Sequence, residues 1–184
     1  FSIFKVFKEE VHKCIACDVC PISYDDSEKY RCIINNKDDF FKKNHNQIID
    51  CDSFIFAAYS GTNFINIKTN YQQFIERTRY LRRDNYLFGR KLVSSFILSE
   101  VNSNRNLHIR ILTSLMRHHN VLFKPILVFK NANAYINFEN IKRQFIEFCN
   151  TAKKVKNDRS KVEYKPVGYE ISLEEHLNRK NLSK

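Results

Sequence analysis

The 184-residue sequence contains no tryptophan, one methionine, three glycines and three prolines. It has no run of 18 apolar residues, which excludes an ordinary membrane-spanning helix, and no signal-peptide pattern. A content of 43% hydrophobic and 14% aromatic residues argues against intrinsic disorder. The six cysteines stand in an otherwise ordinary globular composition, which argues against a secreted disulfide scaffold. We therefore expect a cytoplasmic protein in a reducing compartment, with no membrane association.

The formal net charge is +11, from 31 Lys and Arg against 20 Asp and Glu. A basic surface attracts nucleic acids, anionic cofactors and acidic partner proteins. The basic residues are spread along the chain, apart from short groups within residues 77–83 and 153–161. Because a solvated basic surface explains the charge equally well, nucleic-acid binding ranks last among the functions that we expect.

Hydrophobic patterning predicts strands and helices in alternation. We expect strands at residues 1–7, 53–59, 91–98 and 122–129, and helices at residues 38–50, 71–81, 106–119 and 138–154. Apolar runs such as SFIFAAY are typical of strands buried on both faces of a parallel sheet. The alternation predicts an α/β domain with a mostly parallel sheet over residues 1–157. The polar composition of residues 158–184 predicts a C-terminal extension.

Four cysteines lie close together near the start of the chain, at Cys14, Cys17, Cys20 and Cys32. The compact C-x2-C-x2-C run suits a short loop around an iron–sulfur cluster. A tetrahedral zinc site usually separates two C-x2-C pairs more widely, and a reduced cluster of thiols without metal is the third reading. Spacing favours the iron–sulfur cluster over zinc or no metal. Pro21, directly after Cys20, prevents the loop from continuing as a helix.

In their order along the chain, four segments resemble the NADPH-dependent FMN reductase family in its iron–sulfur flavoprotein branch. They are CIACDVCP at residues 14–21, Cys32 followed by Asp38-Asp39, IIDCDSFIFAAYSGTNF at residues 48–64, and FIER at residues 74–77. The resemblance covers roughly residues 14–129. It implies a flavodoxin-like three-layer sandwich that is truncated at the N-terminus, because the family's phosphate-binding loop would lie upstream of Phe1.

By this resemblance the chain is an NAD(P)H-dependent FMN reductase that passes electrons through FMN and a 4Fe–4S cluster to an acceptor. It is expected to act as a homo-oligomer or with a partner chain. The cluster would be held by Cys14, Cys17, Cys20 and Cys32. The flavin ring would be held by Ser60, Gly61, Thr62, Asn63 and Phe64, with a second contact from residues 99–104. An ordinary strand-to-helix turn at residues 60–63 is the simpler reading of the residues alone.

The alternative function is a degenerate, non-catalytic flavodoxin-like module with a structural zinc or cluster site, acting in a larger assembly. The remaining candidates have simpler explanations. His118-His119 is expected to be a solvated pair, and His12 is a weak candidate zinc ligand. Asp38-Asp39 is expected to cap a helix through the helix dipole. Arg77, Arg79, Arg82 and Arg83 are expected on a charged helix face, and contact with a phosphate or an acidic partner is the alternative.

Overall fold

The computed structural model describes residues 2–4, 6, 10–17, 20, 30, 32–60, 65–83, 87–99, 105–129 and 138–158. Its strands are β1 (Ser53–Ser60), β2 (Leu92–Ser99), β3 (Val121–Leu122) and β4 (Ile126–Phe129). Its helices are α1 (Phe40–Asp50), α2 (Ile65–Arg77), α3 (Arg79–Arg83), α4 (Arg105–Met116) and α5 (Phe138–Asp158).

The strands form one sheet in which β2 is central and every pairing between named strands is parallel. β1 lies along one side of β2, while β3 and β4 both lie along the other. β3 and β4 replace the single strand that we expected at residues 122–129. Pro125 explains the interruption because it has no N–H to donate to the ladder. The gap is bridged partly by a side chain, since the Ser94 hydroxyl donates to the Lys124 carbonyl at 2.8 Å.

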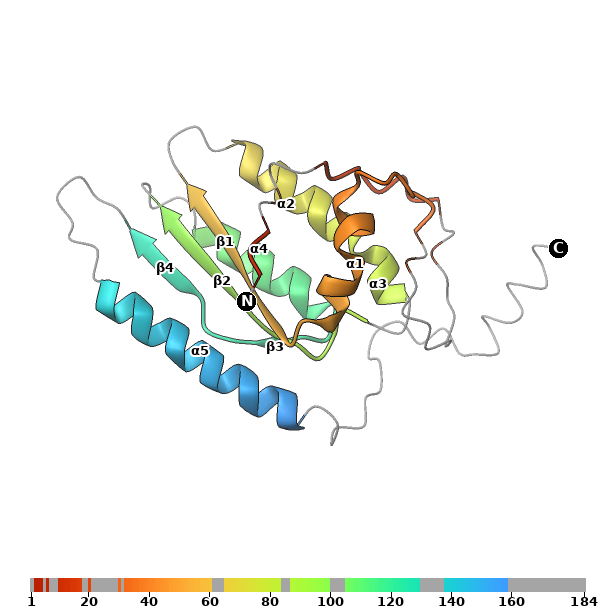
Figure 1. The fold of residues 1–184 in the computed structure, drawn as a ribbon. Helices are drawn as coiled ribbons and strands as arrows, with labels where there is room; N and C mark the ends of the chain where they lie inside the picture. The colour runs from red at the N-terminus through yellow and green to blue at the C-terminus, as the bar shows by residue number, and fades with distance from the viewer. Residues whose placement is uncertain are drawn as a thin grey trace.

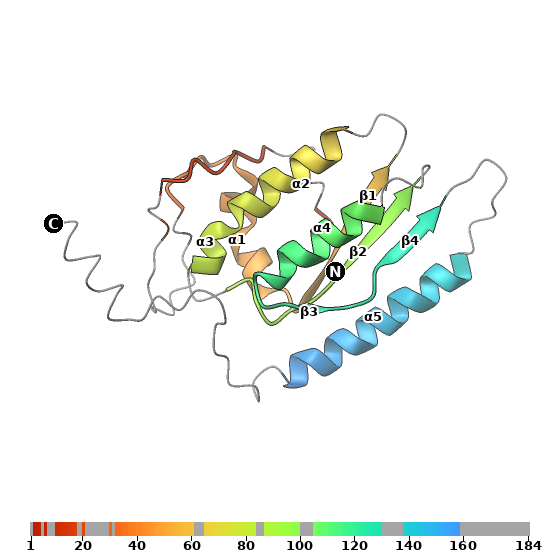
Figure 2. The same ribbon diagram turned by 180° about the vertical axis from the view of Figure 1, so that it is seen from behind.

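Helices cover both faces of the sheet, as Figures 1 and 2 show from opposite sides. α1, α2 and α4 lie on one face, and α5 lies on the other. This arrangement confirms the expected α/β class with a parallel sheet and is consistent with a flavodoxin-like three-layer sandwich.

The side chains of β2 point alternately to the two faces of the sheet, and each face has its own hydrophobic cluster. Val93 and Ile97 are fully buried in the larger cluster with residues of α1, α2 and α4. Leu92, one position out of phase, packs instead with Phe148 and Ala152 of α5. Successive side chains of a strand point to opposite faces, so a strand buried on both sides needs apolar residues at nearly every position.

The N-terminal segment departs from expectation. None of its described residues (2–4 and 6) belongs to a strand. Phe4 contributes to the core all the same, because its ring meets Phe40 edge-on at a centroid distance of 5.9 Å. Glu10 then makes an isolated parallel bridge with Asp39, which ties the segment to the start of α1.

α5 ends at Asp158, and the expected extension at residues 158–184 lies otherwise outside the described residues. Among the helices that the structure describes, none has the length and apolar character needed to cross a membrane.

Candidate functional site

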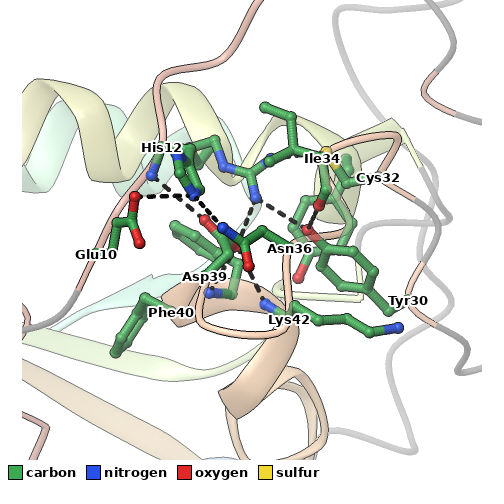
Figure 3. A network of polar contacts seen from close by, with 12 residues as sticks. Glu10, His12, Tyr30, Cys32, Ile34, Asn36, Asp39, Phe40 and Lys42 are labelled. Atoms are coloured by element: carbon green, nitrogen blue, oxygen red, sulfur yellow. Dashed lines mark hydrogen bonds and ion pairs between the residues drawn. The ribbon is translucent and has the colours of Figure 1, made fainter.

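The most concentrated polar chemistry of the described chain surrounds Arg77, the last residue of α2. Its side chain is 1% exposed and forms an ion pair with the fully buried carboxylate of Asp39, with Nη2 2.7 Å from Oδ1. The same Nη2 donates to the Tyr30 hydroxyl at 2.9 Å, and Nη1 donates to the Cys32 sulfur at 2.6 Å. We call Tyr30, Cys32, Asp39 and Arg77 the arginine network (Figure 3).

Helix ends place both charges of the ion pair. Asp39 is the N-cap of α1, and its Oδ1 accepts hydrogen bonds from the backbone N–H groups of Phe41 and Lys42. A carboxylate is favoured at the positive N-terminal end of a helix dipole, and a cation is favoured at the C-terminal end where Arg77 lies. The sequence therefore favours each charge locally, and the packing of α1 beside α2 brings them together.

The guanidinium remains charged in spite of its burial. Burial alone would lower the pKa of Arg77, but the hydrogen bond to Tyr30 and the neighbouring Asp39 carboxylate outweigh it and raise this pKa overall. Burial raises the pKa of Tyr30 well above its usual value, because it disfavours the charged phenolate. The Tyr30 hydroxyl is thus neutral, and it donates to the Ile34 carbonyl while it accepts from Arg77.

Aromatic rings enclose the arginine network on its inner side. The Tyr30 ring lies edge-on to His45 and to Tyr80, with centroids 5.5 and 5.1 Å away. His45 Nδ1 is 3.0 Å from the Tyr80 hydroxyl. The guanidinium carbon of Arg77 lies 5.3 Å from the ring centre of Phe41, within range of a cation–π contact. These rings exclude water, which strengthens the electrostatic interactions of the network.

The arginine network also contacts the N-terminal segment, at residues 10–12, through Asp39. The backbone N–H of His12 donates to Asp39 Oδ2 at 3.3 Å. The His12 ring contacts Glu10 and Asn36, each at 3.3 Å. Figure 3 shows these side chains around the Asp39 carboxylate. Asp39 therefore joins the cysteine-bearing segment, α1 and α2 at one point.

The four predicted metal ligands, Cys14, Cys17, Cys20 and Cys32, all belong to the described chain, and each is partly exposed and in no disulfide. Cys20 and Cys32 pack against the larger core cluster. In the part of the chain that the structure describes, no three His, Cys, Asp or Glu side chains are grouped so that they could hold a metal ion. The metal site therefore stays a prediction, and the contact that the structure gives to Cys32 is with Arg77.

The predicted flavin loop begins at Ser60, the last residue of β1. Gly61, Thr62, Asn63 and Phe64 lie outside the described residues. The strand register nevertheless pairs Ser60 with Ser99, the last residue of β2. The last residues of β1 and β2 thus lie side by side at the carboxyl edge of the sheet. This is the edge at which open α/β sheets bind ligands.

Two expectations about charged residues were wrong. Arg77 does not lie on an exposed helix face but is buried against Asp39. His118 is not solvated: it is 1% exposed, and its Nε2 is 2.9 Å from the Thr78 hydroxyl. The expected helix cap at Asp38-Asp39 is confirmed for Asp39.

A second buried polar pair was missed from the sequence. On β2, Ser95 places its hydroxyl beside Nδ1 of His108, which projects from α4. His108 Nε2 is buried and has no hydrogen-bond partner among the described residues. Burial lowers the pKa of His108, so its ring is neutral at pH 7. No signal in the sequence marks this pair, because Ser95 sits in an apolar strand and His108 in an ordinary amphipathic helix.

The geometry carries the chemical argument, because comparison with known proteins adds no family assignment. The sequence matches no protein-family model, and no curated protein shows significant similarity to it.

Proposed function

We propose that this chain is an iron–sulfur flavoprotein-like oxidoreductase that passes electrons from NAD(P)H through FMN to an acceptor. The observation that supports it best is the alignment of Ser60 with Ser99 at the carboxyl edge of a parallel sheet. Ser60 and Ser99 are the first residues of the two segments in which the sequence predicts ring contacts. A ligand bound there would contact both segments at once.

The residues that would hold the flavin ring are Ser60 to Phe64, with a second contact from residues 99–104. Bound FMN would supply hydride acceptance and single-electron transfer. The chain's own part is to position the ring. β1 and β2 are paired over eight residues from Ser53↔Leu92 to Ser60↔Ser99, which fixes the start of both segments.

Cys14, Cys17, Cys20 and Cys32 would hold the predicted 4Fe–4S cluster, and in the described part of the chain no three metal-ligand side chains are grouped as such a site needs. We therefore assign no electron-transfer step to these cysteines. The arginine network has a defined role without a metal, because Arg77 holds Cys32 and Asp39 against the core.

The second candidate function is a non-catalytic flavodoxin-like module that supports a larger assembly, with structural zinc or a cluster at the cysteines. The observation that favours it is the arginine network itself. Arg77 directs its three hydrogen bonds at Tyr30, Cys32 and Asp39, and it is 1% exposed. Such a network stabilises the fold, since both Nη atoms of Arg77 are occupied by contacts within the chain.

Visible absorption and metal analysis of the purified chain distinguish the two functions. The redox function predicts the absorption and fluorescence of flavin after incubation with FMN, and iron with acid-labile sulfide. Cys17→Ser should remove the iron, whereas Cys149→Ser, an exposed thiol on α5, should leave it unchanged. A colourless protein that contains zinc and binds no FMN would refute the redox function and support the module.

A further inference from the structure

A shallow, open cavity of about 360 Å³ lies on the surface at α2, α4 and the N-terminal segment. It is lined by Lys13, Lys68, Thr69, Gln72, Gln73, Glu76 and Arg110. The lining residues come from three separate parts of the chain: the N-terminal segment, α2 and α4. The cavity contains none of the predicted flavin or metal residues.

Positive charge dominates the cavity. Lys13, Lys68 and Arg110 face one carboxylate, that of Glu76. Glu76 Oε1 already accepts a hydrogen bond from Gln72 Nε2 at 2.9 Å. Within the described ranges, none of the three cations forms an ion pair with a carboxylate. Three cations that face a common space with a single carboxylate leave an excess of positive charge, which favours an anionic ligand.

Each of the three cations belongs to a segment that is fixed by contacts with the rest of the fold. Lys68, Gln72 and Glu76 are spaced by four residues, so they share one face of α2. The opposite face of α2 is fixed because Tyr71 and Phe74 are buried in the larger core cluster.

The other two cations are anchored in similar ways. Arg110 is exposed on α4 between the buried Leu107 and Ile111. Lys13 directly follows His12, whose N–H donates to Asp39. Asp39 of the arginine network therefore also holds the N-terminal segment that contributes Lys13 to the cavity.

We propose that this cavity binds a phosphorylated small molecule. Its volume lies at the small end of the range for small-molecule sites, about 300–1,000 Å³. Three of the four charged side chains around it are cationic, which suits a phosphate group. Arg110 offers a planar guanidinium that matches two phosphate oxygens, and the two lysines supply compact charges.

Calorimetric titration of the full chain with inorganic pyrophosphate tests the proposal. Lys68→Gln with Arg110→Gln should weaken binding by at least about tenfold, because two charge-assisted contacts are lost. The control is Lys142→Gln with Lys153→Gln, two exposed lysines of α5 on the other face of the sheet. The control has the same net charge and should bind like the parent chain. Equal weakening of both variants would overturn the proposal in favour of general surface charge.

Further ligands identify what is recognised. ADP should bind and adenosine should not, because the phosphate carries the recognition. Tight binding of single-stranded RNA together with no saturable binding of pyrophosphate would overturn the proposal in favour of a nucleic-acid surface. The titration needs no flavin or iron, so its outcome is independent of the redox function proposed above.

Discussion

Replacement of Arg77 by methionine removes the guanidinium of the arginine network and keeps an apolar stem within the core. Asp39 then remains a fully buried carboxylate without its paired cation. Removal of one partner from a buried ion pair destabilises a protein by about 3–5 kcal/mol. Asp39 keeps its hydrogen bonds from three backbone N–H groups, so we expect the lower half of that range. Even about 3 kcal/mol is a large part of a typical domain's stability of about 5–15 kcal/mol.

The chain offers a matched control for this substitution. Lys124 and Glu147 form an ion pair of the same length, 2.7 Å, but their side chains are 52% and 51% exposed. Substitution within an exposed pair should change stability by only about 0.2–1 kcal/mol. Because the two pairs share the same distance, the difference between them measures the effect of burial.

Equilibrium unfolding in urea provides the assay, applied as a double-mutant cycle. Arg77→Met and Asp39→Ser should be non-additive by about 1–3 kcal/mol, because the second substitution removes a charge that the first has already left unpaired. Serine is chosen since it can still cap α1. Lys124→Met with Glu147→Ser should be additive within about 0.5 kcal/mol. Similar coupling energies for the two pairs would refute our reasoning that burial makes the arginine network strong.

Three further outcomes are expected. Tyr30→Phe removes a hydroxyl that accepts from Arg77, and it should lower the free energy of unfolding by about 1–3 kcal/mol in urea titrations; no change would show that the network does not need this bond. Lys91→Met should destabilise the chain by a similar amount, because the buried Lys91 ammonium donates to two carbonyl groups at the C-terminal end of α1. Faster hydrogen exchange of the α1 backbone amides in the variant is the measurement that checks this. Burial lowers the pKa of His108 in the folded chain. As the pH falls below about 6.5, the His108 ring is therefore protonated in the unfolded chain before it is protonated in the folded chain. The free energy of unfolding should decrease in this range by up to about 1.4 kcal/mol per pH unit. Thermal unfolding at a series of pH values should show a smaller decrease for His108→Leu, and an identical decrease would argue that His108 is protonated in the folded state.

The sheet and its helices could be predicted because their signals are local. The apolar runs at residues 53–59 and 91–98 correspond to β1 and β2 within one or two residues. Asp39 could be predicted as a helix cap because capping depends on its immediate neighbours. Residues 2–4 and 6, the described part of the strand expected at residues 1–7, lie outside any strand, because alternation alone does not supply a partner strand.

Charged residues were the least predictable part of the chain. Arg77 lies in a helix rich in polar residues, where a solvated position is the usual outcome. Its burial depends on a carboxylate 38 residues away and a thiol 45 residues away, and no local pattern records these distances. The cavity at Lys68 and Arg110 was missed for the same reason, since its lining comes from three segments.

The sequence by itself therefore determined the elements, their alternation and the parallel α/β class, because hydrophobic period and helix capping act over a few residues. Only the tertiary structure decided which charged groups meet. It placed Cys32, which spacing had suggested as a metal ligand, against the guanidinium of Arg77. It also set the carboxyl ends of β1 and β2 side by side and gathered three cations around one cavity. The physical reason is that buried charges must find partners across the core, and those partners are fixed by packing and not by nearness in sequence.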